Sequence, residues 1–369
     1  MKFNKKDYKH YIIFVSYLLI FITGYFVTKV KKNNNNTVFL MGHSFEGNLE
    51  SFYNLNKGDY AIKYLTFDKN KVSDNKNFFY YINLKNVIEL LNCKFIIASH
   101  GILFHKLLKK RKITTISIGH GVQTAIEDLS KSYHLLFDEV WLSSELDKEI
   151  MIDECNYPGS NIQVTGYLSH QLLYTNFKNQ NKNKEKYILY APSALSGAKE
   201  NMRNPLFVHN LTFLKKLNLI AQNYQYKIIV KPHIKDVETK NFNQETYNFI
   251  KEAKNLIYYD DLSIEKNNLS NIAEILITDW SSIYLDFLLQ DKETIFLNSP
   301  KIDNNYNLSS FMKNEFINRC ESWKNIDNHL KKIIEDPNGT DLIKFKKFVF
   351  RDLNFLEINS NCKTRLEHI

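Results

Sequence analysis

Cysteine is rare in this chain, and its distribution excludes two classes of protein. Among 369 residues there are four cysteines, Cys93, Cys155, Cys320 and Cys362, and no two of them form a C-x-x-C pair. Their spacing gives neither a zinc signature nor the framework of a small disulfide-rich domain. Cysteines scattered in this way fit a reduced, intracellular setting.

Several common catalytic and nucleotide-binding motifs are also absent. The sequence has no G-x-x-x-x-G-K-[ST] phosphate loop, no G-x-G-x-x-G fingerprint and no H-E-x-x-H zinc motif. It also lacks a G-x-S-x-G nucleophile elbow and a D-x-D triplet that would hold a metal–nucleotide complex. No residue cluster in the sequence predicts a metal site, and no motif predicts a bound cofactor.

Acidic residues are outnumbered by basic ones. There are 49 Lys and Arg against 40 Asp and Glu, which gives a formal net charge of +9 at pH 7. Such a balance suits an anionic partner, whether nucleic acid, a phosphorylated substrate or an acidic membrane surface. A hydrophobic content of 44% with 24% charged residues describes a folded globular protein, and the length allows two domains with a substantial core.

The N-terminus carries a long uncharged run. Residues Tyr11 to Thr28 contain no charged side chain, and lysines stand on both sides of them. About 20 apolar residues cross a bilayer, so this run is at the short end of the range. Its aromatic residues and flanking lysines favour a membrane anchor over a signal peptide or a buried soluble helix. We therefore predict an anchor helix with a basic flank over residues 1–36, whose orientation the symmetric lysines leave undecided.

Beyond residue 36, apolar runs alternate with longer amphipathic stretches. The first set of predicted strands is Val38–Met41, Phe95–Ala98, Thr115–Ile118, Glu139–Leu142 and Ile162–Thr165. A polar linker over 175–186 precedes the second set, which is Tyr187–Ala191, Lys227–Val230, Leu256–Tyr259, Ile275–Thr278 and Thr294–Leu297. This alternation predicts two α/β domains with parallel sheets, over 37–175 and 186–340, and a helical tail over 341–369.

One segment combines a buried strand with a polar turn and a helical pattern. The strand Ile275–Thr278 is followed by Asp279, Ser281 and Ser282, and an apolar helical pattern then runs to Leu289. We expect these three residues in the first turn of that helix, where free backbone N–H groups and the helix dipole favour an anion. The two hydroxyls would add donors for a phosphate. The alternative is that Asp279 or Ser281 caps the helix.

Titratable residues follow other predicted strands. Ligands of parallel sheets bind beyond the carboxyl ends of the strands, so these positions are candidates for a site. His120 stands between Gly119 and Gly121, where the backbone can approach a ligand closely and the imidazole suits proton transfer. Lys231 and His233 follow another strand and could grip phosphate oxygens. The alternative for each histidine is an incidental place in a turn.

Taken in order, these segments resemble the CDP-glycerol glycerophosphotransferase family, whose members prime or polymerise wall teichoic acids and related capsule polymers. The matching segments are S-F-E-G-N over 44–48, G-H-G over 119–121, T-G-Y over 165–167, I-L-Y-A-P-S over 188–193, K-P-H over 231–233, and L-I-T-D-W-S-S-I-Y-L-D over 276–286. The chain departs from the family pattern at Gly119, where the family has Trp, and at Ile234, where it has Pro. It also departs in Ala194-Leu195 and in Leu168-Ser169-His170.

The resemblance implies a GT-B architecture of two Rossmann-like domains facing across a cleft, an acceptor domain first and a nucleotide-donor domain second. It implies an enzyme on the cytoplasmic face of the cell membrane that moves a polyol phosphate, such as glycerol phosphate, from a CDP-polyol to a hydroxyl of a lipid-linked glycan. CMP is released, and neither a metal, a cofactor nor nucleic acid takes part. The alternatives are a GT-B glycosyltransferase that uses a nucleotide sugar and a non-catalytic membrane-anchored scaffold.

The resemblance also assigns roles. His120 is the candidate base, and Lys231 and His233 would neutralise the leaving phosphate, His233 being the second catalytic candidate. Ser281 and Ser282 would cradle the diphosphate, and Asp279 would order their turn or contact the polyol. The remaining substrate-binding candidates are Ser44, Asn48, Gly121 and Ser193.

Overall fold

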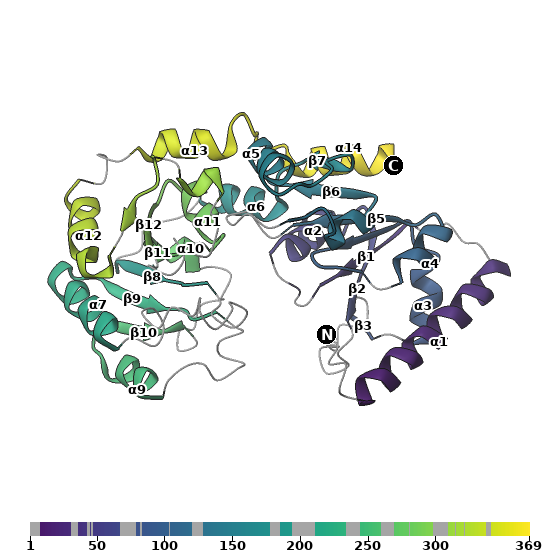
Figure 1. Cartoon of the computed structure of the whole chain (residues 1–369), viewed down its shortest axis with the longest axis horizontal. Helices are drawn as coiled ribbons and strands as arrows, with labels where there is room; N and C mark the ends of the chain where they lie inside the picture. Colours follow the sequence, from purple (N-terminus) through teal and green to yellow (C-terminus); the bar gives the residue numbers. More distant parts are fainter. Residues whose placement is uncertain are drawn as a thin grey trace.

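The structure is a computed structural model with two α/β lobes, each built on a parallel sheet (Figure 1). It describes residues 8–30, 36–42, 45, 47–66, 79–81, 83–102, 104–119, 128–177, 185–193, 211–233, 244–259, 269–279, 281–297, 309–313, 315–320, 322–336 and 341–369. Three of the candidate residues, Ser44, His120 and Gly121, lie outside these ranges.

The first sheet has seven strands in the order β3-β2-β1-β4-β5-β6-β7, and every neighbouring pair is parallel. Its strands are β1 Thr37–Met41, β2 Ala61–Thr66, β3 Phe79–Tyr81, β4 Phe95–Ala98, β5 Thr114–Ile118, β6 Glu139–Leu142 and β7 Ile162–Val164. The five strands predicted for this half are confirmed, whereas β2 and β3 were missed. β2 carries Lys63 among its apolar residues, and that lysine is neutralised by Glu89 of α3 at 2.7 Å.

The second sheet has six strands in the order β10-β9-β8-β11-β12-β13, again with parallel neighbours. Its strands are β8 Tyr187–Tyr190, β9 Lys227–Val230, β10 Leu256–Tyr258, β11 Ala273–Thr278, β12 Glu293–Leu297 and β13 Arg319–Cys320. All five predicted strands are present, and only the two-residue edge strand β13 was missed. This is the strand order of the dinucleotide-binding fold. Its switch point, where the order of successive strands across the sheet reverses, lies between the first and fourth strands, here β8 and β11.

Helices cover both faces of the sheets. They are α1 Tyr8–Val30, α2 Asn48–Asn56, α3 Leu84–Leu90, α4 His105–Lys110, α5 Glu145–Glu149, α6 Leu168–Phe177, α7 Leu211–Tyr224, α9 Gln244–Glu252, α10 Leu269–Ile272, α11 Tyr284–Leu289, α12 Ile326–Glu335, α13 Leu342–Phe350 and α14 Ile358–His368. Alternate residues of β1 enter different cores, because Phe39 packs with α1, α3 and α4 while Val38 packs with α2 and α14. Both faces of the first sheet are therefore buried.

The last helix returns to the first lobe. Phe345 and Val349 of α13 belong to the core of the second lobe, whereas Ile358, Cys362 and Leu366 of α14 complete one core of the first. Arg365 of α14 also pairs with the buried carboxylate of Glu139 in β6. The chain thus crosses from one lobe to the other between α13 and α14, along the upper edge of the molecule (Figure 1).

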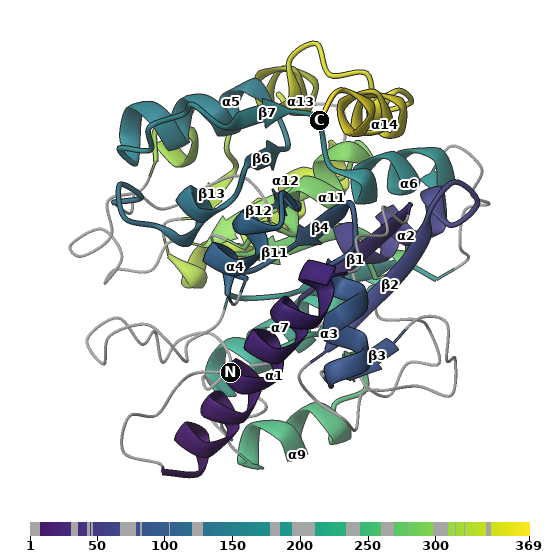
Figure 2. The same ribbon diagram turned by 90° about the vertical axis from the view of Figure 1, so that its right-hand side faces the viewer.

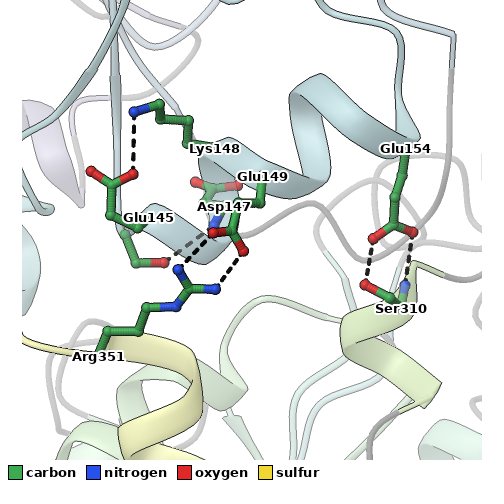
Figure 3. A network of polar contacts seen from close by, with 8 residues as sticks. Glu145, Asp147, Lys148, Glu149, Glu154, Ser310 and Arg351 are labelled. Atoms are coloured by element: carbon green, nitrogen blue, oxygen red, sulfur yellow. Dashed lines mark hydrogen bonds and ion pairs between the residues drawn. The ribbon is translucent and has the colours of Figure 1, made fainter.

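A second connection runs the other way. α5 and the π-helical turn Ile150–Glu154 that continues it follow β6 of the first sheet, yet Leu146 and Ile150 lie in the core of the second lobe. Arg351 donates to Glu149 from both terminal guanidinium nitrogens, and Glu154 accepts from the backbone N–H of Ser310 at 2.8 Å (Figure 3). The two lobes are therefore joined by apolar packing and by polar contacts.

The N-terminal helix is present where the uncharged run predicted one, but it does not stand apart from the domain. Gly24 of α1 lies so close to α3 that a Cβ there would be 2.9 Å from Cγ1 of Val87. Figure 2 shows the two helices side by side. In the described part of the chain, no helix combines the length and the apolarity needed to cross a membrane. α1 lies within the segment 1–36 that was predicted to be an anchor, and its attachment to a membrane stays a prediction.

Candidate active site

The candidate residues of the second lobe gather at the carboxyl ends of three neighbouring strands. Ser193 follows β8, Lys231 and His233 follow β9, and Asp279 follows β11. The strand ends are joined by backbone hydrogen bonds, from Lys231 N to the carbonyl of Tyr190 at 2.9 Å and from Ala191 N to that of Ile277 at 3.0 Å. The structure thus brings together residues that are up to 86 positions apart, at the switch point where this fold binds ligands.

Asp279 locks two of these loops to each other. It is buried, and its Oδ1 accepts a hydrogen bond from the backbone N–H of Ser193 at 2.9 Å. Just before it, the hydroxyl of Thr278 donates to the carbonyl of Ala191 at 2.6 Å. The charge of Asp279, together with burial as the larger cause, holds the pKa of Tyr190 well above its ordinary value. Asp279 therefore joins the loop after β11 to the loop after β8, while its predicted role toward the turn of Ser281 and Ser282 or toward the polyol stays a prediction.

The turn that carries the two serines differs from the prediction. α11 begins at Tyr284, so Ser281 and Ser282 precede the helix instead of forming its first turn. The N-cap position of α11 is occupied by Ile283, which makes no side-chain capping hydrogen bond. The carbonyl of Ser282 accepts from Leu285 N at 3.0 Å. Because α11 has only six residues, its dipole is small, and the serine hydroxyls are the better candidates for binding an anion.

Asp286, in the first turn of α11, is a site residue that sequence reasoning missed. Burial raises the pKa of its carboxyl to about 7, and the positive charge of Lys231 acts in the opposite direction. The carboxyl therefore lies in the field of Lys231 and is close to half-protonated at neutral pH. The available signal was the motif itself, because Asp286 is the last residue of the L-I-T-D-W-S-S-I-Y-L-D segment.

In the first lobe, Asn48 contacts Gly119, the residue before His120. Its Nδ2 donates to the carbonyl of Gly119 at 3.3 Å, and its Oδ1 accepts from both the backbone N–H (3.2 Å) and the hydroxyl (2.7 Å) of Ser169. The side chain predicted to bind substrate thus bridges the end of β5 and the start of α6. Gly119, which stands where the family has Trp, lies against Tyr167, whose hydroxyl oxygen is 2.5 Å from the position of an added Cβ.

Tyr167 lies where the two lobes approach each other. Its charge, after burial and Asp147, is one of the causes that hold the pKa of the buried Tyr284 well above its ordinary value. Tyr284 opens α11, which packs against α6. A short path of contacts therefore leads from Gly119 in the first lobe to the turn of Ser281 and Ser282 in the second.

His170 is part of this packing and takes no proton. It is buried between the rings of Tyr167 and Phe350, with centroid distances of 5.3 and 5.7 Å. Burial lowers the pKa of its imidazole to about 3, so the ring is neutral at physiological pH. This departure from the family sequence fills the interface between α6 and α13.

The two Rossmann-like sheets, with polar residues gathered at the switch point of the second, define a GT-B-like α/β protein. The family model described as CDP-Glycerol:Poly(glycerophosphate) glycerophosphotransferase matches residues 24–306. The chain therefore belongs to this family, as its motifs predicted, and is a glycerophosphotransferase-like enzyme. A comparison with curated proteins finds no match.

Solved structures support the architecture. The chain is similar to the wall teichoic acid polymerase TagF, with a TM-score of 0.69 and 14% identity over 98% of this chain and 100% of that one. A TagF variant soaked with CDPG gives a TM-score of 0.69 at 12% identity, covering 98% of each chain. The UDP-GlcNAc 2-epimerase from Neisseria meningitidis bound to UDP-GlcNAc gives 0.57 at 13%, covering 90% and 100%. At these identities the similarity establishes the fold.

Proposed function

We propose that this protein transfers glycerol phosphate, or a closely related polyol phosphate, from a CDP-polyol to a hydroxyl of a membrane-linked glycan, and releases CMP. The observation that carries the proposal is the convergence of Ser193, Lys231, His233, Asp279 and the Ser281-Ser282 turn at the switch point of the second sheet. Family membership and the likeness to a TagF variant soaked with CDPG support CDP-glycerol as the donor.

The chemistry is a displacement at phosphorus. The oxygen of the acceptor hydroxyl forms a bond to the phosphorus that bears the polyol, and the bond from that phosphorus to the bridging oxygen of CMP breaks. CMP leaves with the electron pair, and the hydroxyl proton passes to a base. Positive charge and hydrogen-bond donors around the diphosphate stabilise the charge that develops there.

The residues divide the work between the lobes. Lys231 and His233 stabilise the departing phosphate, and the hydroxyls of Ser281 and Ser282 hold the diphosphate. Asp279 keeps their turn attached to the loop of Ser193. His120, one residue after the anchored Gly119, is the base that receives the acceptor proton.

The acceptor is the finer part of the proposal. A lipid-linked glycan would bring the reaction to the cytoplasmic face of the cell membrane, and the net charge of +9 suits an acidic bilayer surface. Wall teichoic acid and capsule polymers both fit this chemistry.

The test is to incubate the purified chain with CDP-glycerol, CDP-ribitol and UDP-sugars in turn, each with acceptor-containing membranes, and to follow release of CMP or UDP. We expect acceptor-dependent release of CMP from CDP-glycerol. Release of UDP alone would instead identify a glycosyltransferase. If the folded protein releases neither nucleotide, whether or not it binds CDP, the result would favour a non-catalytic scaffold.

A further inference from the structure

Two serine–histidine pairs lie in the first lobe, outside the residues to which a role has been given. Ser99 follows β4, and its hydroxyl lies 3.0 Å from Nδ1 of His100. The hydroxyl of Ser117 in β5 lies 3.1 Å from Nδ1 of His134, which belongs to the 3₁₀ turn Tyr133–Leu136. Both serine side chains are buried. Each histidine ring is therefore oriented by a hydroxyl that the core of the lobe holds in place.

The sheet and a pair of ring contacts bring the two serine–histidine pairs together. β4 and β5 are neighbouring parallel strands, and their register places Ser99 one residue beyond the partner of Ser117. Gly101 packs against Tyr133, because a Cβ at this glycine would lie 3.6 Å from the tyrosine ring. The ring of Tyr133 lies in turn against that of His134, with 4.2 Å between their centroids. The two pairs thus form one cluster near the carboxyl ends of β4 and β5.

This cluster is close to the end of the strand that leads to the proposed base. Ser117 comes two residues before Gly119, which Asn48 contacts. Both histidines of the cluster are partly exposed, and the side chain of Tyr133 is 38% exposed. Imidazole and phenol groups can donate hydrogen bonds to phosphate oxygens, and the carboxyl ends of parallel strands are where such ligands bind. The cluster can therefore contact a ligand that also reaches the site.

A group of lysines continues from this cluster along α4, the helix that follows the loop of His100. Lys106, Lys109 and Lys110 are exposed and lie on one side of α4, because residues three and four positions apart face the same way. None of the three makes an ion pair within the described part of the chain. Glu89 is the one acidic residue over 83–119, and it is already paired with a lysine of β2. Like charges spaced in this way destabilise a helix unless an anion compensates them.

We propose that this cluster and the three lysines of α4 form an acceptor subsite, which binds the phosphodiester groups of an anionic acceptor chain. A chain of polyol phosphates carries one negative charge for each unit, and hydrogen bonds between charged partners are the strong ones. Lys106 and Lys110 are about 6 Å apart along the helix axis, so α4 can contact successive phosphates that one polyol separates. The subsite would hold units already present in the acceptor while its terminal hydroxyl reaches the proposed base.

Lipid headgroups are the other source of phosphate, and they fit this subsite less well. A flat bilayer meets side chains that project from a protein, whereas His100 and His134 are partly buried and are oriented by buried serines. A single flexible chain can contact these rings and continue along α4. The inference rests on the proposed function for the identity of the acceptor chain, and on the contacts of the first lobe for the subsite itself.

The test measures how tightly full-length proteins bind lipid-free poly(glycerol phosphate) when no donor is present. One variant is His100→Gln/His134→Gln, which removes both imidazoles. The other is Lys106→Gln/Lys109→Gln/Lys110→Gln, in which all the substituted side chains are exposed. Fluorescence anisotropy of the end-labelled polymer gives Kd over a range of salt concentrations, and melting curves check that the variants fold. If the histidine variant does not fold, the lysine variant decides the test.

The control removes the same number of positive charges from the second lobe. It is Lys331→Gln/Lys332→Gln/Lys347→Gln, at exposed positions of α12 and α13. The control and the lysine variant have the same net charge, so a difference between them reports the place of the charges and not their sum.

We expect each variant to raise the Kd for the polymer by about tenfold or more, while the control binds like the wild type. The lysine variant should also make binding less dependent on salt, because fewer phosphates are neutralised. Equal Kd values for the wild type and both variants would overturn the inference, as would equal losses in the lysine variant and the control. So would a wild type that binds phosphatidylglycerol vesicles but not the polymer, because the lysines would then serve lipid headgroups. Polymer binding without any release of CMP would contradict the proposed function and not the subsite.

Discussion

The bridge made by Asn48 offers the sharpest test of how the site is positioned. Its amide joins Gly119 O to Ser169, with the donor side at 3.3 Å and the acceptor side at 3.2 and 2.7 Å. Asn48→Asp keeps an acceptor oxygen for Ser169 but replaces the amide donor by an oxygen that faces the carbonyl of Gly119. The substitution therefore removes one contact of the bridge and conserves the size of the side chain.

The magnitude follows from that single contact. A lost hydrogen bond costs about 0.5–1.5 kcal/mol, and a charged oxygen turned toward a carbonyl adds to it, so we expect about 1–3 kcal/mol of lost stability. If Gly119 moves by about 1 Å to relieve the repulsion, the proposed base moves with it, and such a displacement costs about 10²-fold in rate. Removing the proposed base itself, in His120→Ala, should lower the rate by about 10²–10⁴-fold, and this variant gives the lowest activity expected among these substitutions.

The assay is CMP release from CDP-glycerol in the presence of acceptor, with kcat and KM measured from pH 6 to 9 beside a urea unfolding curve. Asn48→Asp should lower kcat and leave the KM for CDP-glycerol nearly unchanged, because the residues proposed to bind CDP-glycerol lie in the other lobe. Ser169→Ala is the control, since it removes the hydroxyl contact and retains the bond to Gly119. If Asn48→Asp and Ser169→Ala lose equal stability and equal kcat, Asn48 only supports the fold and the positioning role is refuted.

Three further outcomes are expected. The double variant Ser281→Ala/Ser282→Ala should weaken CDP binding, by about 1.5–3 kcal/mol for each hydroxyl that contacts a charged oxygen, with little change in Tm; calorimetric titration beside a melting curve checks this, and an unchanged affinity contradicts the phosphate role. Burial raises the pKa of Asp286 to about 7 in the folded state, whereas in the unfolded state it is about 4. Between these two pH values the unfolded state binds fewer protons, so the free energy of unfolding falls as the pH rises from about 4 to about 7. The Tm of the wild type relative to Asp286→Asn should therefore fall across that window, and parallel curves would disprove the shift. Gly166→Ala, at φ +80° and with its Cβ 2.7 Å from Ile358, should destabilise the fold by about 2–4 kcal/mol in urea, whereas Gly58→Ala, which meets no atom within 4 Å, should not.

The interior of both sheets was readable from the sequence because it is made of continuous apolar runs. Central parallel strands such as β4 and β8 are covered on both faces, which leaves four apolar or nearly apolar residues in a row as their signature. The strands that were missed lie toward the edges or contain a charge: β3 and β13 have three and two residues, and β2 contains Lys63. Such segments take their structure from the neighbour they pair with.

The part of the candidate site that could be predicted is the part formed by residues at the carboxyl ends of parallel strands, because the sheet topology places these ends side by side. The grouping of Ser193, Lys231 and Asp279 follows from a parallel sheet once the strands are known. The role of Asn48 does not, since its partners are 71 and 121 residues away and no local pattern encodes them. The start of α11 was placed too early, because Asp279, Ser281 and Ser282 were expected in its first turn, whereas the helix begins at Tyr284.

The return of α14 to the first lobe has a consequence for biosynthesis. The pocket that receives Ile358 and Leu366 is formed by segments translated early, including β1 and β6, whereas the residues that fill it emerge only after the whole second lobe. At about 5–20 residues per second, the first lobe waits roughly ten to forty seconds on the ribosome with that apolar surface uncovered. We therefore expect the first lobe to depend on chaperones during synthesis. We also expect a proteolytic cut before α14 to destabilise the first lobe.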